Sequence, residues 1–107
     1  MARLYLMNSP VLTDYGLWRF HGPLNRLQAR ELVTQGCISA IGHEGAAQLL
    51  SRLLQIKIQT SRIQVHFSPG DKAVVLRLKQ RLPEGRVLSK DELKNMAWEL
   101  ALLERLE

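Results

Sequence analysis

Several kinds of residue are scarce in this chain of 107 residues, and each scarcity excludes something. Cys37 is the only cysteine, so no internal disulfide can form, which favours a reducing, cytoplasmic setting. Phe, Trp and Tyr occur only twice each, too few for a long surface that stacks single-stranded nucleic acid. The longest apolar stretch, around residues 37–42, is far too short to span a bilayer, and no signal-peptide pattern is visible. We therefore expect neither a membrane protein nor a secreted one.

Charge is abundant and unevenly distributed. The net charge is +5, from 15 Lys and Arg against 10 Asp and Glu. The residues from Ser89 onward hold three basic and five acidic side chains, so the preceding 88 residues hold twelve and five. A basic body followed by an acidic C-terminal helix suits an anionic ligand. Scattered arginines that merely solubilise the surface are the alternative.

Length and pattern together predict one α/β domain over residues 1–107, with a small mixed β-sheet flanked by about three helices. Alternating and β-branched residues predict strands at 3–7, 17–20, 37–41, 63–67 and 73–76, the last two as a hairpin. Apolar periodicity predicts a helix between Asn25 and Gly36 and another through residues 46–54. A capping box at Ser89 and Glu92 predicts a last helix that packs Leu93, Met96, Ala97, Leu100 and Leu103 on the sheet.

Residues 39–44, Ser-Ala-Ile-Gly-His-Glu, place a glycine and a histidine where a short extended segment leads into the second helix. Backbone N–H groups and a partial positive charge at a helix N-terminus favour a bound phosphate. Histidine is the side chain best suited to proton transfer near neutral pH. His43 is thus a candidate for phosphodiester chemistry, and a histidine that only caps the helix is the alternative.

Two other polar segments could serve an anionic ligand. Arg81 and Glu84 flank Leu-Pro in a loop, where an arginine fork can pair with phosphate and a glutamate can orient a hydroxyl or an imidazole. Asn8-Ser9 follows the first predicted strand, and ligands bind at the carboxyl ends of strands in open α/β sheets. An exposed charged loop and a simple turn are the respective alternatives.

Metal and cofactor fingerprints are missing from the sequence. His21, His43 and His66 have no histidine four residues away and no neighbouring cysteine, so no metal site is predicted. No phosphate-loop or dinucleotide-binding motif occurs either, and we expect no cofactor.

The motifs of this chain, taken in order, resemble those of the small viral anti-CRISPR ring nucleases and their cellular relatives. The shared strings are Leu-Tyr-Leu at residues 4–6, Asn-Ser-Pro at 8–10, Ser-Ala-Ile-Gly-His-Glu at 39–44, Leu-Leu-Ser at 49–51, Arg-Ile at 62–63, Pro-Gly-Asp at 69–71 and Arg-Leu-Pro-Glu-Gly at 81–85. The resemblance spans nearly the whole chain. It departs from the family pattern at Gly45-Ala46-Ala47, Gln55 and Ser61, where more polar residues, glycine and asparagine are common.

This resemblance implies a homodimer that binds cyclic tetra-adenylate and cleaves it without a metal. His43 matches the catalytic histidine of the family, and Arg81 and Glu84 match its loop arginine and glutamate. Asn8, Ser9, Gly42 and Arg62 match positions that contact the ligand.

Such a ring carries its own nucleophile, the ribose 2′-hydroxyl, and His43 would protonate the departing 5′-oxygen. Two copies of His43 would then leave linear di-adenylates that end in 2′,3′-cyclic phosphate. No long nucleic acid is expected as a substrate. A non-enzymatic sponge for cyclic nucleotides, a small nucleic-acid-binding regulator and an inert oligomerisation module are the rival interpretations.

Overall fold

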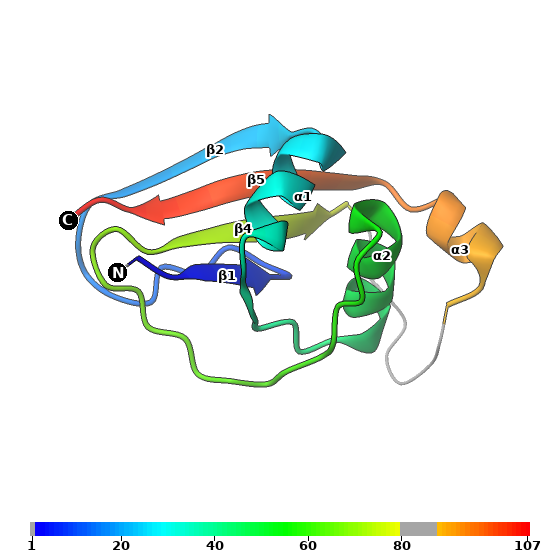
Figure 1. Cartoon of the computed structure of the whole chain (residues 1–107), viewed down its shortest axis with the longest axis horizontal. Helices are drawn as coiled ribbons and strands as arrows, with labels where there is room; N and C mark the ends of the chain where they lie inside the picture. Colours follow the sequence, from blue (N-terminus) through cyan, green and yellow to red (C-terminus); the bar gives the residue numbers. More distant parts are fainter. Residues whose placement is uncertain (1, 80–87) are drawn as a thin grey trace.

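The computed structural model describes residues 2–79 and 88–107, which form one five-stranded sheet and three helices (Figure 1). Along the chain the elements are β1 (Leu4–Met7), β2 (Trp18–Leu24), α1 (Arg26–Thr34), β3 (Ile38–Ser39), α2 (Glu44–Leu54), β4 (Lys72–Leu78), α3 (Lys90–Lys94) and β5 (Trp98–Arg105). The strand order is β2-β5-β4-β1-β3. The predicted α/β class is therefore confirmed. Within the described residues no helix is long and apolar enough to cross a membrane.

The sheet is mixed, and its parallel part sets up the candidate site. β1 lies between β3 and β4 and runs parallel to both, with Tyr5 opposite Ile38 on one side and Ala73 on the other. β5 pairs antiparallel with β4 and with the edge strand β2. Because parallel strands end at the same edge of a sheet, the segments that follow β1 and β3 emerge side by side.

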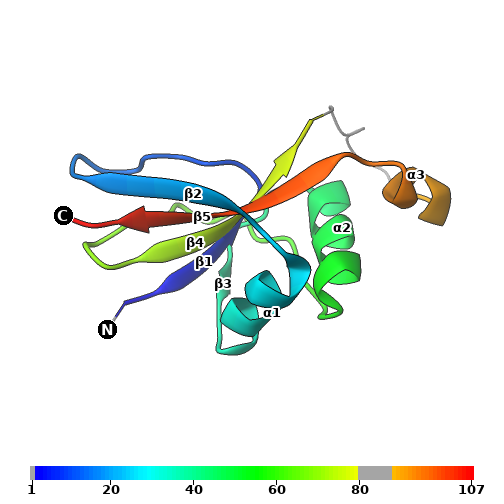
Figure 2. The same ribbon diagram turned by 90° about the horizontal axis from the view of Figure 1, so that it is seen from above.

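Two helices, α1 and α2, cover one face of the sheet (Figure 2). Leu49, Leu50, Leu53 and Leu54 of α2 are at most 9% exposed and pack in one cluster with sheet residues such as Val74. Full burial of each leucine contributes about 1.5–3 kcal/mol. The stripe predicted for α2 is confirmed, as are the helix that Asn25 caps and the turn at Gly36, whose φ is 114°.

The opposite face of the sheet is covered by a segment without regular structure. Phe67 is 1% exposed, and its ring lies 5.2 Å from Tyr5 and 5.0 Å from Trp18 between centroids. Its N–H donates to Thr13 Oγ1 and Asp14 Oδ2, each at 3.0 Å. Phe67 thus anchors the long connection from α2 to β4 without joining the sheet.

The predicted hairpin of residues 63–67 with 73–76 is wrong. β4 is hydrogen-bonded to β1 on one edge and to β5 on the other, so neither edge is free for a hairpin partner. The second predicted strand is longer than expected. β2 continues through Gly22-Pro23, and its pairing with β5 shifts register between His21 and Leu24. An edge strand tolerates this because only one of its edges is hydrogen-bonded to a neighbouring strand.

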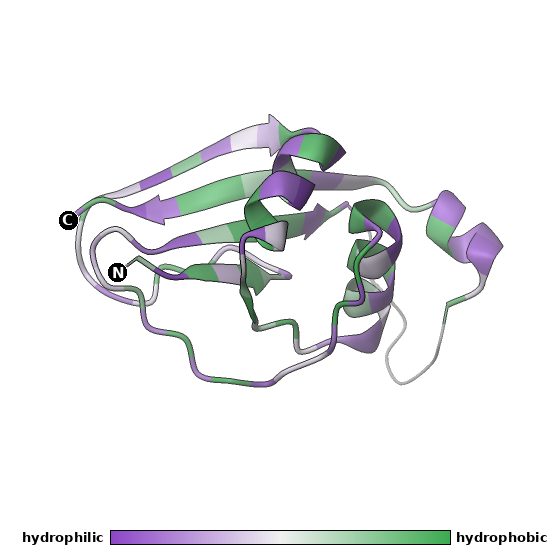
Figure 3. Cartoon of the chain, in the orientation of Figure 1, coloured by the Kyte–Doolittle hydropathy of each residue, from purple (hydrophilic) through white to green (hydrophobic). Residues whose placement is uncertain are grey.

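The predicted C-terminal helix is wrong beyond its first turn. The capping box of Ser89 and Glu92 is present, but α3 ends at Lys94 and residues Trp98–Arg105 form β5. All four residues at positions 100–103 are buried, because β5 lies between β4 and β2 and both of its faces are covered. Figure 3 shows this as a largely apolar centre in β4 and β5, whereas α3 is hydrophilic. Tertiary context has overridden the helix propensity of Leu, Ala and Glu.

The carboxylate of Asp71 is buried at the end of the sheet where the chain begins, and it joins Arg3 to Ser68 by hydrogen bonds. It is 1% exposed, and it accepts hydrogen bonds from Arg3 N at 2.8 Å, the Arg3 guanidinium at 3.1 Å and Ser68 N at 2.9 Å. Burial by itself raises the pKa of Asp71, but these donors outweigh it and hold that pKa below its ordinary value. The charged carboxylate therefore stabilises the fold.

We expect Asp71→Asn to lower the free energy of unfolding at pH 7 by about 2 kcal/mol, because a donor replaces one acceptor oxygen in a buried site. A carboxyl with a depressed pKa contributes fully above its unfolded pKa, and the contribution disappears as the pH falls through the folded value. Urea unfolding between pH 2 and 7 should therefore show a shallower acid-side decrease for the variant. Asp91→Asn, exposed on α3, is the control. Equal acid sensitivity of parent and Asp71→Asn would contradict the assignment.

Candidate functional site

The helix α2 begins at a histidine whose side chain caps it. His43 has extended backbone angles, φ −134° and ψ 124°, and its Nδ1 accepts the backbone N–H of Gly45 at 3.1 Å. An imidazole nitrogen that accepts a hydrogen bond carries no proton, so the neutral ring holds its proton on Nε2. The alternative of a capping histidine is thus part of the structure, and it fixes which nitrogen bears the proton.

Gly45 provides the space for this cap. A Cβ at position 45 would lie 3.2 Å from His43 Cε1 and 3.2 Å from Leu88 Cδ1, closer than side chains ordinarily approach. His43 Nε2 is buried and has no hydrogen-bond partner among residues 2–79 and 88–107. A buried donor without a partner costs about 1–3 kcal/mol. Such an atom can be satisfied by a bound ligand.

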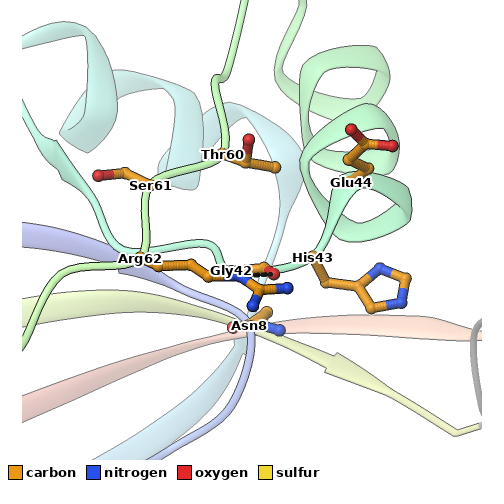
Figure 4. A pocket seen from close by; sticks show the side chains of 7 residues that line it. All are labelled: Asn8, Gly42, His43, Glu44, Thr60, Ser61 and Arg62. Carbon is orange, nitrogen blue, oxygen red and sulfur yellow. Dashed lines mark hydrogen bonds between the residues drawn. The ribbon is translucent and has the colours of Figure 1, made fainter. Parts of the chain in front are cut away.

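A polar cleft of about 1020 Å³ opens at the N-terminus of α2. It is lined by Asn8, Gly42, His43, Glu44, Thr60, Ser61 and Arg62 (Figure 4). Asn8 follows β1, and Gly42 and His43 follow β3, so the cleft lies beyond the carboxyl ends of two adjacent parallel strands. This is the place where open α/β sheets bind ligands.

The segment after α2 forms the third wall of the cleft. Hydrogen bonds hold it against β3 and the residues that follow β3. Ser39 Oγ donates to Gln59 O at 2.6 Å, and Ser61 N donates to Ile41 O at 2.8 Å. Arg62 Nε donates to Gly42 O at 3.2 Å. These bonds hold Arg62 at the mouth of the helix although no strand is present to position it.

The guanidinium of Arg62 is available for an anion. Only its Nε is engaged, and within the described part of the chain neither terminal nitrogen has a hydrogen-bond or ion-pair partner. The side chain is exposed at the cleft. Two free terminal nitrogens of a guanidinium can bind a phosphate by two parallel hydrogen bonds.

The imidazole and the guanidinium do not converge. Figure 4 shows that the His43 ring points away from Arg62, under the first turn of α2, while Arg62 reaches toward Gly42 and Asn8. The N-terminus of α2 therefore separates the side of the cleft that holds the guanidinium from the side that holds the imidazole. A ligand that uses both must extend across Gly42.

The structure brings together four of the residues predicted from sequence, namely Asn8, Gly42, His43 and Arg62. Ser9 is exposed beside Asn8 and does not line the cleft. Arg81 and Glu84 lie outside the described residues. Glu44, Thr60 and Ser61 also line the cleft and were not predicted as site residues, although Glu44 belongs to the motif at 39–44 and Ser61 is a position where the resembling family commonly has asparagine. No group of three His, Cys, Asp or Glu residues in the described ranges could hold a metal ion.

Several known proteins are similar to this chain in sequence or in fold. A family model described as STIV B116-like matches residues 4–100. The ORF117 protein of Acidianus two-tailed virus is 32% identical over 111 residues, covering 97% of this chain and 94% of the viral protein. The YddF protein of Bacillus subtilis is 35% identical over 69 residues, or 64% of each chain. The solved structure of B116 of Sulfolobus turreted icosahedral virus aligns with a TM-score of 0.79 at 25% identity, covering 97% of this chain and all of that one.

Two substitutions separate the capping role of His43 from its chemistry. We expect His43→Ala to have a free energy of unfolding about 1 kcal/mol lower than that of His43→Asn, because asparagine is a preferred capping residue and alanine leaves the first turn of α2 uncapped. Both variants lose the Nε2 that has no partner among the described residues, so their difference isolates the cap. Urea unfolding followed by circular dichroism measures both variants. Equal stability of the alanine and asparagine variants would contradict the capping role.

Proposed function

The chain belongs to the STIV B116-like family, and we propose that it is a metal-independent ring nuclease that cleaves cyclic tetra-adenylate, the second messenger of type III CRISPR systems. One observation carries the proposal. A histidine caps α2 beside a polar cleft at the carboxyl ends of parallel strands, and an arginine with free N–H groups stands on the other side. The identity of the substrate is inferred from the motif resemblance to ring nucleases.

The cleft has the chemistry that a phosphodiester requires. The N-terminus of α2 offers a partial positive charge, Arg62 offers a planar fork, and Asn8 offers an amide. One phosphate of the ring would bind here. The adjoining adenylate would extend past Gly42 toward His43.

Cleavage needs no water and no metal because the substrate carries its own nucleophile. The 2′-oxygen attacks the adjacent phosphorus, the new P–O2′ bond forms, and the P–O5′ bond breaks with its electron pair on the 5′-oxygen. His43 protonates that oxygen, and the proton of the 2′-hydroxyl leaves to solvent or to a nearby base. The products carry a 2′,3′-cyclic phosphate and a 5′-hydroxyl.

The ligand-free geometry adds a requirement to this scheme. In the ligand-free geometry Nδ1 accepts the Gly45 N–H and therefore carries no proton, whereas a general acid must start as the doubly protonated imidazolium. Bound phosphates favour that cation electrostatically. Protonation of Nδ1 would release the Gly45 N–H, which is then free to donate to a phosphate oxygen.

The partners in the reaction are carried over from the resemblance. Arg81 would stabilise the charge on the phosphorane, and Glu84 would orient the 2′-hydroxyl or the imidazole. Ser9 would contact the ligand beside Asn8. A homodimer would bring two copies of His43 to opposite phosphates of the four-membered ring, since a two-fold interface repeats every site. The site of action would be the cytoplasm of the host cell.

A non-enzymatic sponge for the same ring is the second candidate. The observation that favours it is the burial of His43 Nε2, which leaves the proton-bearing atom without access to solvent in the ligand-free chain. A sponge would bind the ring at the same cleft and leave it intact.

We expect the purified protein to convert cyclic tetra-adenylate into linear di-adenylate with a 2′,3′-cyclic phosphate in excess EDTA. His43→Asn should lower the rate by about 100- to 10,000-fold, the usual size of general acid catalysis, while the helix cap is kept. Chromatography of the products with mass detection measures both. Tight binding without turnover would indicate the sponge, and salt-dependent retention of duplex DNA without ring binding would indicate a nucleic-acid-binding regulator. A fully active His43→Asn would refute the catalytic role.

Arg62 should act mainly on binding. We expect Arg62→Ala to weaken the affinity for the ring by about tenfold or more, because a charge-assisted bidentate contact contributes about 1.5–3 kcal/mol. Arg62→Lys should recover only part of the affinity, since lysine lacks the fork. Arg52→Ala, at an exposed position in the last turn of α2, is the matched control. Calorimetric titration in the His43→Asn background measures affinity without cleavage, and unchanged affinity of Arg62→Ala would remove Arg62 from the site.

A further inference from the structure

Gln48, one turn into α2, holds the backbone of Leu88 by two hydrogen bonds. Its Nε2 donates to Leu88 O at 2.6 Å, and Leu88 N donates to its Oε1 at 2.8 Å. The two residues are 40 positions apart in sequence. A primary amide is the side chain that offers a donor and an acceptor side by side, so the pairing specifies glutamine rather than glutamate or leucine.

Leu88, which Gln48 holds, and the ring of His43 both lie close to Gly45. Leu88 is 3% exposed. Its Cδ1 and the Cε1 of His43 each lie 3.2 Å from the point that a Cβ on Gly45 would occupy. The imidazole therefore sits over Gly45 with Leu88 beside it. In this orientation Nδ1 meets the Gly45 N–H and Nε2 is buried.

We propose that Gln48 is a positioning residue for His43: it fixes Leu88, and Leu88 over Gly45 keeps the imidazole in the single orientation that carries the proton on Nε2. The inference rests on the proposed cleavage for its catalytic consequence, but not for the orientation itself. Proton transfer depends on placement of the donor within a few tenths of an ångström. If Leu88 loses its two hydrogen bonds to Gln48, it can move away from Gly45, and the His43 ring then has room to rotate.

The absence of a side chain at Gly45 leaves the space that the His43 ring and Leu88 occupy. A methyl group at position 45 enters the space that His43 and Leu88 share, at 3.2 Å from each. Alanine suits a helix better than glycine does, so the fold of α2 tolerates the change, while the His43 ring and Leu88 must shift by a few tenths of an ångström to admit the methyl group. Gly45→Ala thus disturbs the ring orientation without altering Gln48.

The test compares Gln48→Leu and Gly45→Ala with the parent, by two measurements. We expect kcat for ring cleavage to fall by about 10- to 100-fold with little change in KM, the size of loss that a misplaced catalytic group produces. Nitrogen-15 NMR of the imidazoles, with His43 assigned by its absence in His43→Asn, should show a dominant Nε2–H tautomer in the parent and a mixture in both variants. Circular dichroism verifies that each variant is folded.

Gln28→Leu is the matched control, because Gln28 Oε1 also accepts a backbone N–H, from Asn25 in the capping box of α1. It should leave the His43 tautomer and kcat unchanged. A Gln48→Leu protein with the parental tautomer and parental kcat would overturn the proposal, as would an unchanged tautomer in Gly45→Ala. If the parent itself does not cleave the ring, the proposed function fails, and the tautomer measurement still decides whether Gln48 orients His43.

Discussion

The burial of one apolar stripe determines where the candidate site of this protein lies. The four leucines at positions 49, 50, 53 and 54 are buried and pack α2 against the sheet in one cluster. As a result, the N-terminus of α2 points at the carboxyl ends of β1 and β3. The cleft, the cap and the positive end of the helix dipole all depend on that placement.

The candidate site is assembled from segments that are distant in sequence. Asn8 comes from the end of β1, Gly42 and His43 from the junction of β3 and α2, and Arg62 from an irregular segment. Three hydrogen bonds tie that segment to the junction, and they take the place of a strand. Irregular backbone can thus hold a charged side chain in place when its own polar groups are satisfied locally.

His43 links the stability of the helix to the protonation of its side chain. The same nitrogen that caps α2 must gain a proton before the ring can act as an acid. Under the proposed function, the Gly45 N–H must therefore give up Nδ1 before His43 can act, so the cap and the proposed reaction use the same atom.

Local signals sufficed for part of the fold and of the site. Asn25, Ser89 and the leucine stripe of α2 predicted helix starts and a buried face, because capping and amphipathicity act within a few residues. Positions 8, 42, 43 and 62 were singled out by motif. The hairpin failed because it depends on which strand edges are free, and the C-terminal helix failed because residues 100–103 are buried from both sides. Both are properties of the assembled sheet.

By itself, then, the sequence determined the α/β class, the start of α2 at a histidine and the residue types that suit a phosphate. The folded chain alone shows that Arg62 lies at Gly42, that the imidazole turns away from Arg62, and that Gln48 holds Leu88 beside Gly45. The physical reason is distance along the chain. Caps and stripes are satisfied by neighbouring residues, whereas these contacts join positions 20 to 40 residues apart and form only when the core has closed.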